Sequence, residues 1–441
     1  MVDSAGPSIW HRFAHVPRKI AGGNTNNVAC NHYRRWREDV EWMRRLGLTA
    51  YRFSLSWSRI LPEGTGRVNQ RGLDFYRRLI DALLAAGIEP FVTLYHWDLP
   101  AALDDRGGWL SRDVAGWFAD YAAVCYRALD DRVRWWATLN EPWVVADGGY
   151  LDGVLAPGRE SAAEAVRAAH HLLLAHAAGV EAYRAVGRHQ IGLVLNFEPK
   201  HPASDRPEDL AAAARADAYM NRHYADPVFL GRYPDELAEI YGEAWTAPSA
   251  VDLERIRVPI DFLGINYYTR SVVRHDPAEP WLRAARVLQP ESVYTATDWE
   301  VYPAGLAEIL RWVRDRYGAV PLYVTENGAA FDDPPAAVGG RVDDPQRVAY
   351  LADHLRALAA VRTDGADVRG YFVWSLLDNF EWAYGFAKRF GLLHVDYATL
   401  ARTPKASALF YADVIRSRGA VLSGPEASTT LFAGGGAPLF L

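Results

Sequence analysis

The stretch EDVEWMRRLGLTAYRFSLSW (residues 38–57) places two different hydrophobic patterns side by side. Val40, Met43 and Leu46 recur at helical spacing before Gly47, and apolar and polar side chains alternate after that glycine. The first pattern predicts an amphipathic helix that ends at a glycine, and the second predicts a β-strand. A helix that leads directly into a strand is the repeating unit of a parallel sheet, so the stretch predicts an α/β fold.

The same alternation continues along most of the chain. With residues 49–57, seven strands are predicted, the others at 89–97, 133–142, 190–197, 261–269, 321–328 and 368–378. Helices are predicted around 71–87, 111–129, 160–186, 208–241, 303–317, 345–361 and 404–418. Short connections and an even composition predict one domain over residues 1–418, followed by a tail over 419–441 that is a candidate to pack on that domain.

The number of strands bears on the type of α/β fold. A (β/α)8 TIM barrel closes with eight strands, whereas a doubly wound open sheet normally has a glycine-rich phosphate turn after its first strand. The segment SWSRILPEG (residues 56–64) is no such turn. We therefore predict a TIM barrel whose first strand is missing.

Composition and charge exclude several classes of protein. The 48 basic and 54 acidic residues are interspersed and give a net charge of −6, which does not favour nucleic acid as a partner. Cys30 and Cys125 are too few for a disulfide framework, and no apolar run approaches the length of a membrane helix or a signal peptide. We expect a cytoplasmic protein, and the strong excess of arginine over lysine is typical of a bacterial source.

Polar and aromatic side chains collect at the ends of the predicted strands. They are Arg52, His96, Asn140, Glu141, Tyr268, Glu326, Trp374 and Glu381. Because the reactive groups of barrels lie at the C-terminal ends of the strands, we expect these residues to share one rim. Two carboxylates from different strands suit glycoside hydrolysis, and aromatic rings suit sugar stacking. For any one of these residues a purely structural role is the simpler alternative, but their number at different strand ends favours a catalytic site.

Six motifs identify a family that this chain resembles. They are YRFSLSWSRI, YHWDLP, TLNEPW, LGINYYTR, YVTENG and WSLLDNFEWAYGFAKRFGL. Over about Gly6 to Val414 the sequence resembles glycoside hydrolase family 1, the β-glucosidase family. The resemblance implies a retaining β-glycosidase that acts on terminal β-D-glucosides or short β-linked oligosaccharides, with β-fucosides and β-galactosides as secondary substrates.

The resemblance also implies a role for each site residue. Glu141 is the expected acid/base and Glu326 the expected nucleophile, with Arg52 and Tyr268 beside Glu326 and Asn140 on the 2-hydroxyl of the sugar. The remaining expected contacts are His96, Glu381 and Trp382 on sugar hydroxyls, Trp374 beneath the ring, Phe390 at the pocket edge, and Trp143 and Trp299 in the leaving-group site. No cofactor or metal is expected, and the spacing of His170, His171 and His176 does not suit a metal site.

The opening segment MVDSAGPSIWHRF (residues 1–13) departs from the family pattern. Family members begin with a strand whose glutamine binds the sugar, and nothing here matches it. The strands at 49–57 and 368–378 would then have free edges, which attract pairing. The tail, a second copy of the chain, or direct closure of a smaller barrel could bridge them. The alternative function is a catalytically weak or silent sugar-binding relative with an incomplete pocket.

Overall fold

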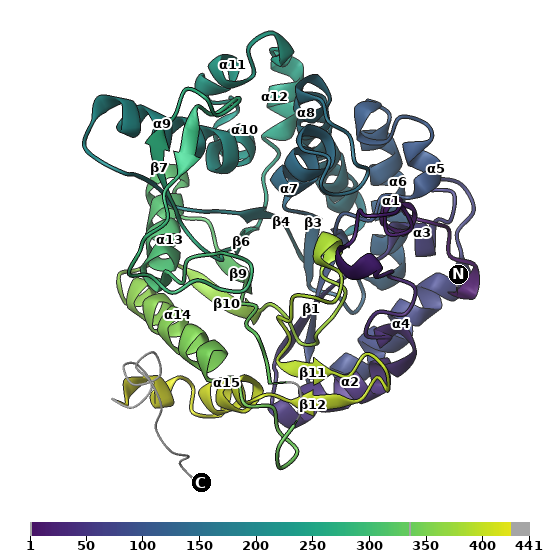
Figure 1. Cartoon of the computed structure of the whole chain (residues 1–441). Coiled ribbons are helices and arrows are strands. Elements are labelled where there is room, and N and C mark those ends of the chain that lie inside the picture. The colour runs from purple at the N-terminus through teal and green to yellow at the C-terminus, as the bar shows by residue number, and fades with distance from the viewer. Residues whose placement is uncertain (1, 335–336, 425–441) are drawn as a thin grey trace.

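The computed structural model describes residues 2–334 and 337–424, and its centre is a parallel sheet of seven strands that curves into a nearly closed barrel (Figure 1). The strand order is β1-β2-β3-β4-β6-β9-β10. These strands are β1 (Ala50–Ser54), β2 (Glu89–Tyr95), β3 (Trp135–Asn140), β4 (Gln190–Asn196), β6 (Phe262–Asn266), β9 (Leu322–Asn327) and β10 (Val368–Val373). Each lies within a strand predicted from the sequence, and all neighbours pair in parallel, so the (β/α) barrel type is confirmed.

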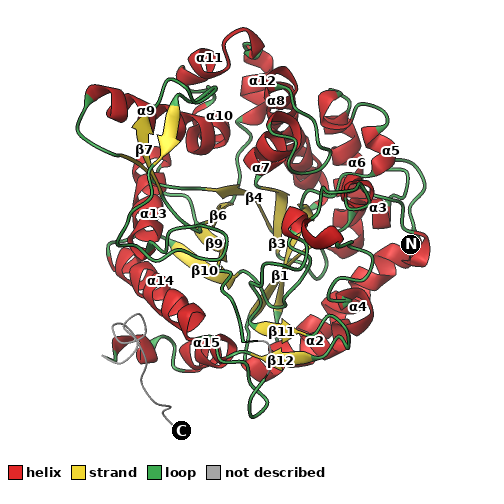
Figure 2. Cartoon of the chain, in the orientation of Figure 1, coloured by secondary structure: helices red, strands yellow, loops and turns green. Residues whose placement is uncertain are grey.

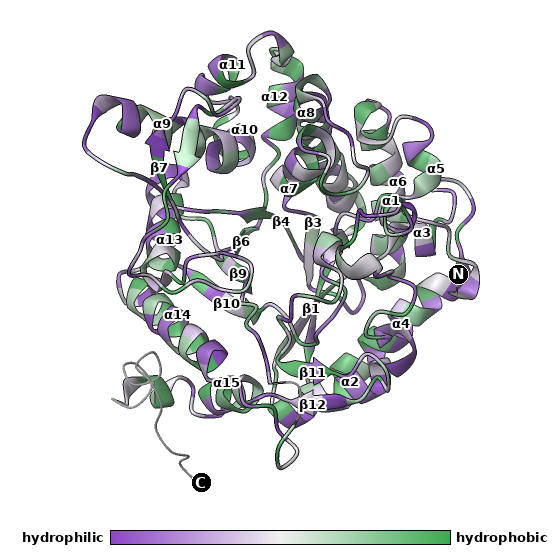
Figure 3. Cartoon of the chain, viewed as in Figure 1, coloured by the Kyte–Doolittle hydropathy of each residue, from purple (hydrophilic) through white to green (hydrophobic). Residues whose placement is uncertain are grey.

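Helices surround the sheet and carry both hydrophilic and hydrophobic residues (Figure 3). They are α1 (Ile9–Phe13), α2 (His32–Leu46), α3 (Trp57–Ile60), α4 (Gln70–Ala85), α5 (Ala101–Asp104), α6 (Val114–Leu129), α7 (Pro142–Ala146), α8 (Ala162–Val186), α9 (Pro207–Asp217), α10 (His223–Leu230), α11 (Glu236–Tyr241), α12 (Ala250–Ile256), α13 (Pro303–Tyr317), α14 (Pro345–Thr363) and α15 (Ala406–Arg416). Short 3-10 or π segments connect several of them, including Ala420–Ser423 after α15.

The predicted helix-to-strand unit forms as expected. Val40, Met43 and Leu46 are buried along α2, and Gly47 closes the helix with a left-handed φ of 72°. A residue with a Cβ is strained at that φ, which explains why glycine suits the position. The chain then enters β1 within three residues of the cap.

The sequence did not predict two small additional sheets. One contains β5 (Lys200–Pro202), β7 (Ser271–His275) and β8 (Ala284–Arg286), and the other is the hairpin of β11 (Leu393–Val395) and β12 (Arg402–Pro404). Figure 2 shows these strands outside the central barrel. All are short insertions after barrel strands, where the hydrophobic pattern is too brief to predict a strand.

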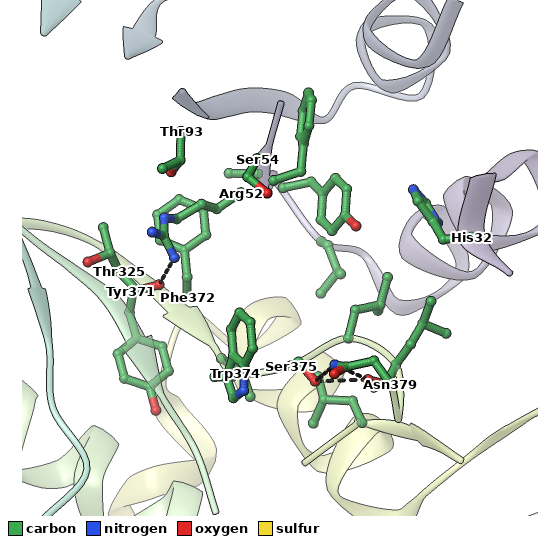
Figure 4. Close-up of a pocket in the computed structure, with 18 of the residues that line it drawn as sticks. His32, Arg52, Ser54, Thr93, Thr325, Tyr371, Phe372, Trp374, Ser375 and Asn379 are labelled. Atoms are coloured by element: carbon green, nitrogen blue, oxygen red, sulfur yellow. Dashed lines mark hydrogen bonds between the residues drawn. The ribbon is translucent and has the colours of Figure 1, made fainter. Parts of the chain in front are cut away.

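The two end strands of the central sheet, β1 and β10, do not pair with each other in the part of the chain that the structure describes. The predicted alternative of direct closure into a smaller barrel is therefore wrong. A cavity of about 400 Å³ lies between the two strands. Arg52 and Ser54 line it from β1, and Tyr371 and Phe372 line it from β10 (Figure 4).

Burial follows this arrangement. The residues of β3 and β9 are buried almost throughout, whereas those of β1 and β10 are mostly half-buried. On the outside, Tyr411 and Ile415 of α15 close the cavity. We call this space the β1–β10 gap.

Candidate active site

The expected site residues come together at the C-terminal ends of the barrel strands. Arg52 lies on β1, Asn140 ends β3, and Glu326 lies near the end of β9. His96 directly follows β2, and Trp374 directly follows β10. The fold therefore brings onto one rim residues that are far apart in the sequence, as a barrel does for its reactive groups.

Both carboxylate oxygens of Glu326 accept a hydrogen bond. Arg52 donates from Nη1 to Oε1 at 2.7 Å, and the Tyr268 hydroxyl donates to Oε2 at 2.6 Å. Glu326 is 3% exposed, and the Arg52 side chain is 6% exposed. A buried carboxylate with a guanidinium on one oxygen and a phenol on the other is held in one orientation, with its negative charge balanced.

Glu141 has a different environment. It is 5% exposed and accepts one hydrogen bond, at 2.9 Å from Asn266 Nδ2 to Oε1. Burial, followed by the negative charge of Glu326, raises the pKa of Glu141 to about 8. Glu141 is therefore protonated at neutral pH and can act as an acid, whereas the neighbouring Glu326 has a cation to stabilise its charge.

Asn140 connects the two carboxylates. Its Oδ1 accepts from Arg52 Nη2 at 2.6 Å and from Asn266 Nδ2 at 3.1 Å, and its Nδ2 lies 3.3 Å from His96 Nε2. Burial and the charge of Arg52 lower the pKa of His96 well below its usual value, so the imidazole is neutral. The side chains of Asn140 and His96 are thus fixed before any sugar binds.

Aromatic rings form one wall of the site. The ring of His96 stacks with those of Trp374 and Trp382 at centroid distances of 5.8 Å and 5.9 Å. Trp97 and Trp10, which the sequence did not indicate, also pack against Trp382, at centroid distances of 4.8 Å and 4.5 Å. The opening helix α1 therefore contributes directly to the support of this wall.

The other expected contacts lie around the same rim. Trp299 lies 4.9 Å from Tyr268 and 6.1 Å from Phe390 between ring centroids. Trp143 contacts Tyr219 instead, at 6.1 Å, on the segment that follows Glu141. Glu381 directly precedes Trp382, and burial together with the charge of Glu326 raises its pKa to about 8.

Sequence reasoning missed Asn266 and Thr325, which are each 1% exposed. Asn266 contacts Asn140 and Glu141, and the Thr325 hydroxyl donates to Asn266 Oδ1 at 2.7 Å. One signal could have found Asn266. It lies two residues before Tyr268 in LGINYYTR, and the alternation of a strand directs residues two apart to the same side.

The three histidines considered for a metal have ordinary partners. His176 Nδ1 lies 2.7 Å from the Thr138 hydroxyl, and His171 Nδ1 lies 2.8 Å from the Trp109 carbonyl. His170 Nδ1 lies 3.0 Å from the Tyr233 hydroxyl. Over residues 2–334 and 337–424, no three His, Cys, Asp or Glu side chains are grouped to hold a metal ion. No helix in the same described ranges is long and apolar enough to cross a membrane.

Comparison with known proteins decides the family. The model of glycosyl hydrolase family 1 matches residues 1–420. This chain belongs to glycosyl hydrolase family 1. It is 47% identical to a 1,4-beta-D-glucan glucohydrolase of Thermotoga neapolitana over 423 residues, which cover 95% of this chain and 94% of the relative. It is also 47% identical to Beta-glucosidase A of Thermotoga maritima over 421 residues, with the same two coverages.

A solved structure of a family 1 relative agrees with the fold. The beta-glucosidase from Thermotoga maritima in complex with glucoimidazole superposes with a TM-score of 0.92 at 46% identity, covering 95% of this chain and 94% of that one. The coverage of these family members is nearly complete, so the comparisons do not support the expectation that the chain lacks the family's first strand. That expectation rested on the count of seven predicted strands and on the opening segment, which packs through Trp10 against the site.

Proposed function

We propose that Glu326 and Glu141 act as nucleophile and acid/base in a retaining β-glucosidase. The contrast between the two buried carboxyl groups supports these roles most directly. Glu326 has a guanidinium and a phenol to stabilise its charge, whereas burial and the charge of Glu326 keep Glu141 protonated. Glycoside hydrolysis with retention requires one carboxylate and one carboxylic acid in this relation.

The reaction proceeds in two steps. Glu326 attacks the anomeric carbon while Glu141 gives its proton to the departing oxygen, which forms a glycosyl ester on Glu326 and releases the alcohol. Glu326 has then lost its charge, so the pKa of Glu141 falls and Glu141 can accept a proton from the water that hydrolyses the ester. The β configuration of the sugar is kept because each step inverts it once.

The sugar contacts follow from the positions of the surrounding side chains. We infer that His96, Asn140, Glu381 and Trp382 hold the sugar hydroxyls, that Trp374 lies beneath the ring, and that Phe390 bounds the pocket. Trp143 and Trp299 form the leaving-group site. Because Glu381 offers a phosphorylated sugar a carboxyl group instead of a cation, we expect neutral β-glucosides, with β-fucosides and β-galactosides as secondary substrates.

The test is hydrolysis of an aryl β-glucoside by the protein and its Glu326→Gln variant. We expect kcat to fall by at least about 10⁴-fold in the variant, since the covalent step is lost. Glu254→Gln, which changes an exposed carboxylate away from the site, serves as the control and should keep full activity. Equal rates for the protein and Glu326→Gln would refute the roles proposed. They would favour instead the alternative of a catalytically silent sugar-binding relative, which the complete catalytic set makes the weaker interpretation.

We also propose that the predicted tail, residues 419–441, packs at the β1–β10 gap. Residues 425–441 lie outside the described residues, but the segment before them is anchored by the hydrogen bond from Arg356 Nε to the Leu422 carbonyl at 3.0 Å. It follows α15, whose residues Tyr411 and Ile415 line the β1–β10 gap. The edges of β1 and β10 beside this gap are unpaired in the described residues, and free strand edges attract a further strand.

Truncation after Ser423 tests the tail proposal. We expect a lower melting temperature, and sedimentation should then show whether the exposed edges lead to self-association. An unchanged melting temperature and solubility would refute the proposal.

We further expect a bacterial, cytoplasmic enzyme. Nucleic-acid partners are not expected, because the acidic and basic residues are interspersed.

A further inference from the structure

Asn266 lies at the end of β6, where its side chain contacts both Glu141 and Asn140. Its Nδ2 donates to Glu141 Oε1 at 2.9 Å and to Asn140 Oδ1 at 3.1 Å. Asn266 is 1% exposed, so these hydrogen bonds have no competition from bulk water. Among the described residues, Asn266 is the one whose side chain forms a hydrogen bond with the carboxyl group of Glu141.

The orientation of the Asn266 amide is determined by its neighbours. The Thr325 hydroxyl donates to Asn266 Oδ1 at 2.7 Å, which assigns the oxygen to that side. On the other side, Asn140 Oδ1 already accepts from Arg52 and can only receive a further donor. The amide therefore directs its N–H groups to Asn140 and Glu141. In a flipped amide, the oxygen would face the acceptor oxygens of Asn140 and Glu141, and the NH₂ group would face the hydroxyl of Thr325.

This orientation determines which oxygen of Glu141 carries the acidic proton. The N–H group of Asn266 donates its hydrogen bond to a lone pair of Glu141 Oε1. The carboxylic proton of Glu141 cannot occupy that same position. We propose that Asn266, oriented by Thr325, is a positioning residue that keeps the exchangeable proton of Glu141 on Oε2, the oxygen that serves the leaving group and later the water. The inference rests on the acid/base role proposed for Glu141.

The same contact affects the titration of Glu141. The groups that face Glu141 are Glu326 from β9, Arg52 from β1 and Glu381 from the segment after β10, besides Asn266 from β6. The hydrogen bond from Asn266 lowers the pKa of Glu141, against the larger effects of burial and of Glu326. In Asn266→Ala the pKa of Glu141 should rise further, which moves the alkaline limb of the pH profile of kcat/KM upward.

A series of aryl β-glucosides with leaving groups of different basicity provides the test. A basic leaving group needs the proton from Glu141, whereas 2,4-dinitrophenolate leaves without it. For Asn266→Ala we expect kcat/KM to fall about 10–100-fold with phenyl β-glucoside, part of the range that general acid catalysis spans. With 2,4-dinitrophenyl β-glucoside the loss should stay below about 3-fold, because the acid contributes little to that reaction.

Two variants of Thr325 separate positioning from mere packing. Thr325→Val keeps the shape and removes the hydroxyl, so it should show the same dependence on the leaving group as Asn266→Ala. Thr325→Ser keeps the hydroxyl and should behave like the unchanged protein. Asn221→Ala is the matched control, since Asn221 is a buried asparagine that bonds Glu198 and Asp217 away from the site.

The outcomes are distinct. A loss in Asn266→Ala that is equal for all leaving groups, or a pH profile that does not move, overturns the inference about Asn266. A Thr325→Val variant that behaves like the unchanged protein overturns the part that concerns Thr325. Glu141→Gln tests the underlying role separately: if it shows no dependence on the leaving group, the proposed function itself fails, whatever Asn266→Ala shows.

Discussion

The charge on Glu326 should be a large part of the reason that Glu141 is protonated at neutral pH. Glu326→Gln removes that charge and keeps the size and hydrogen-bonding shape of the side chain. The burial of Glu141, the other main cause of its raised pKa, stays the same. The variant therefore isolates the electrostatic effect of one carboxylate on the other.

The expected magnitude follows from the geometry that retention requires. Two unit charges about 5.5 Å apart interact by about 3 kcal/mol at an effective dielectric constant of about 20, which corresponds to about 2 in pKa. The pKa of Glu141 should then fall by about 2 in Glu326→Gln. Arg52, no longer balanced by Glu326, acts in the same direction because its positive charge favours ionised Glu141.

The assay is a titration of the side-chain carboxyl carbons by NMR in protein labelled at glutamate. Glu141→Gln identifies the resonance of Glu141 by its disappearance. A pKa of Glu141 that differs by less than about 0.5 between the unchanged protein and Glu326→Gln would refute the reasoning, since burial alone would then account for the raised value. The change of Glu141 from acid to base between the two catalytic steps would need another cause.

Three further predictions concern stability and the shape of the pocket. Lys405→Met leaves two buried aspartates without their ammonium partner and should lower the free energy of unfolding by about 3–5 kcal/mol, as measured by urea denaturation. In Gly328→Ala the new Cβ would lie 1.8 Å from the Trp374 carbonyl oxygen, so KM should rise and the melting temperature should fall. Gly116→Ala is the control: its new Cβ would have no atom within 4 Å, and the change should stabilise the protein by about 0.5–1 kcal/mol. Burial and the charge of Glu326 raise the pKa of Glu381 from about 4.5, its value in the unfolded chain, to about 8 in the folded protein. Between these two pH values the folded state binds more protons than the unfolded state, so the free energy of unfolding falls as the pH rises. Thermal unfolding of Glu381→Gln should therefore show a gain over the unchanged protein that is larger at pH 8 than at pH 5, and an equal difference at both values would contradict this.

Periodicity was sufficient to predict the barrel strands because each is an alternating or continuously apolar run that is separated from its neighbours by helical patterns. The unit that ends at Gly47 and continues into β1 is an example, and the helix at 303–317 has the predicted bounds. The hairpin of β11 and β12 could not be predicted in this way. Its strands have three residues each, which is too short for a periodic pattern to show.

The site divides along similar lines. Charged and aromatic residues at strand ends, such as Glu326 and Trp374, are chemically conspicuous in the sequence. Asn266 and Thr325 are not, because an amide and a hydroxyl are common in strands and acquire a role only through the atoms that face them. Trp10 was missed for a related reason: its contact with Trp382 joins residues from the two ends of the chain.

The unpaired edges of β1 and β10 show how the catalytic residues also contribute to the fold. No backbone ladder joins the two strands in the described structure, yet Arg52 on β1 donates to Glu326 and to the Thr325 carbonyl on β9, one strand beyond β10. The same guanidinium donates to Asn140 on β3, so one side chain links three strands at the C-terminal rim. These charge-assisted hydrogen bonds are buried, and they hold the rim together where strand pairing does not. Removal of Arg52 should therefore weaken the barrel as well as catalysis, and a sugar that bridges the rim should stabilise it, because a ligand that binds only the folded state shifts unfolding by mass action.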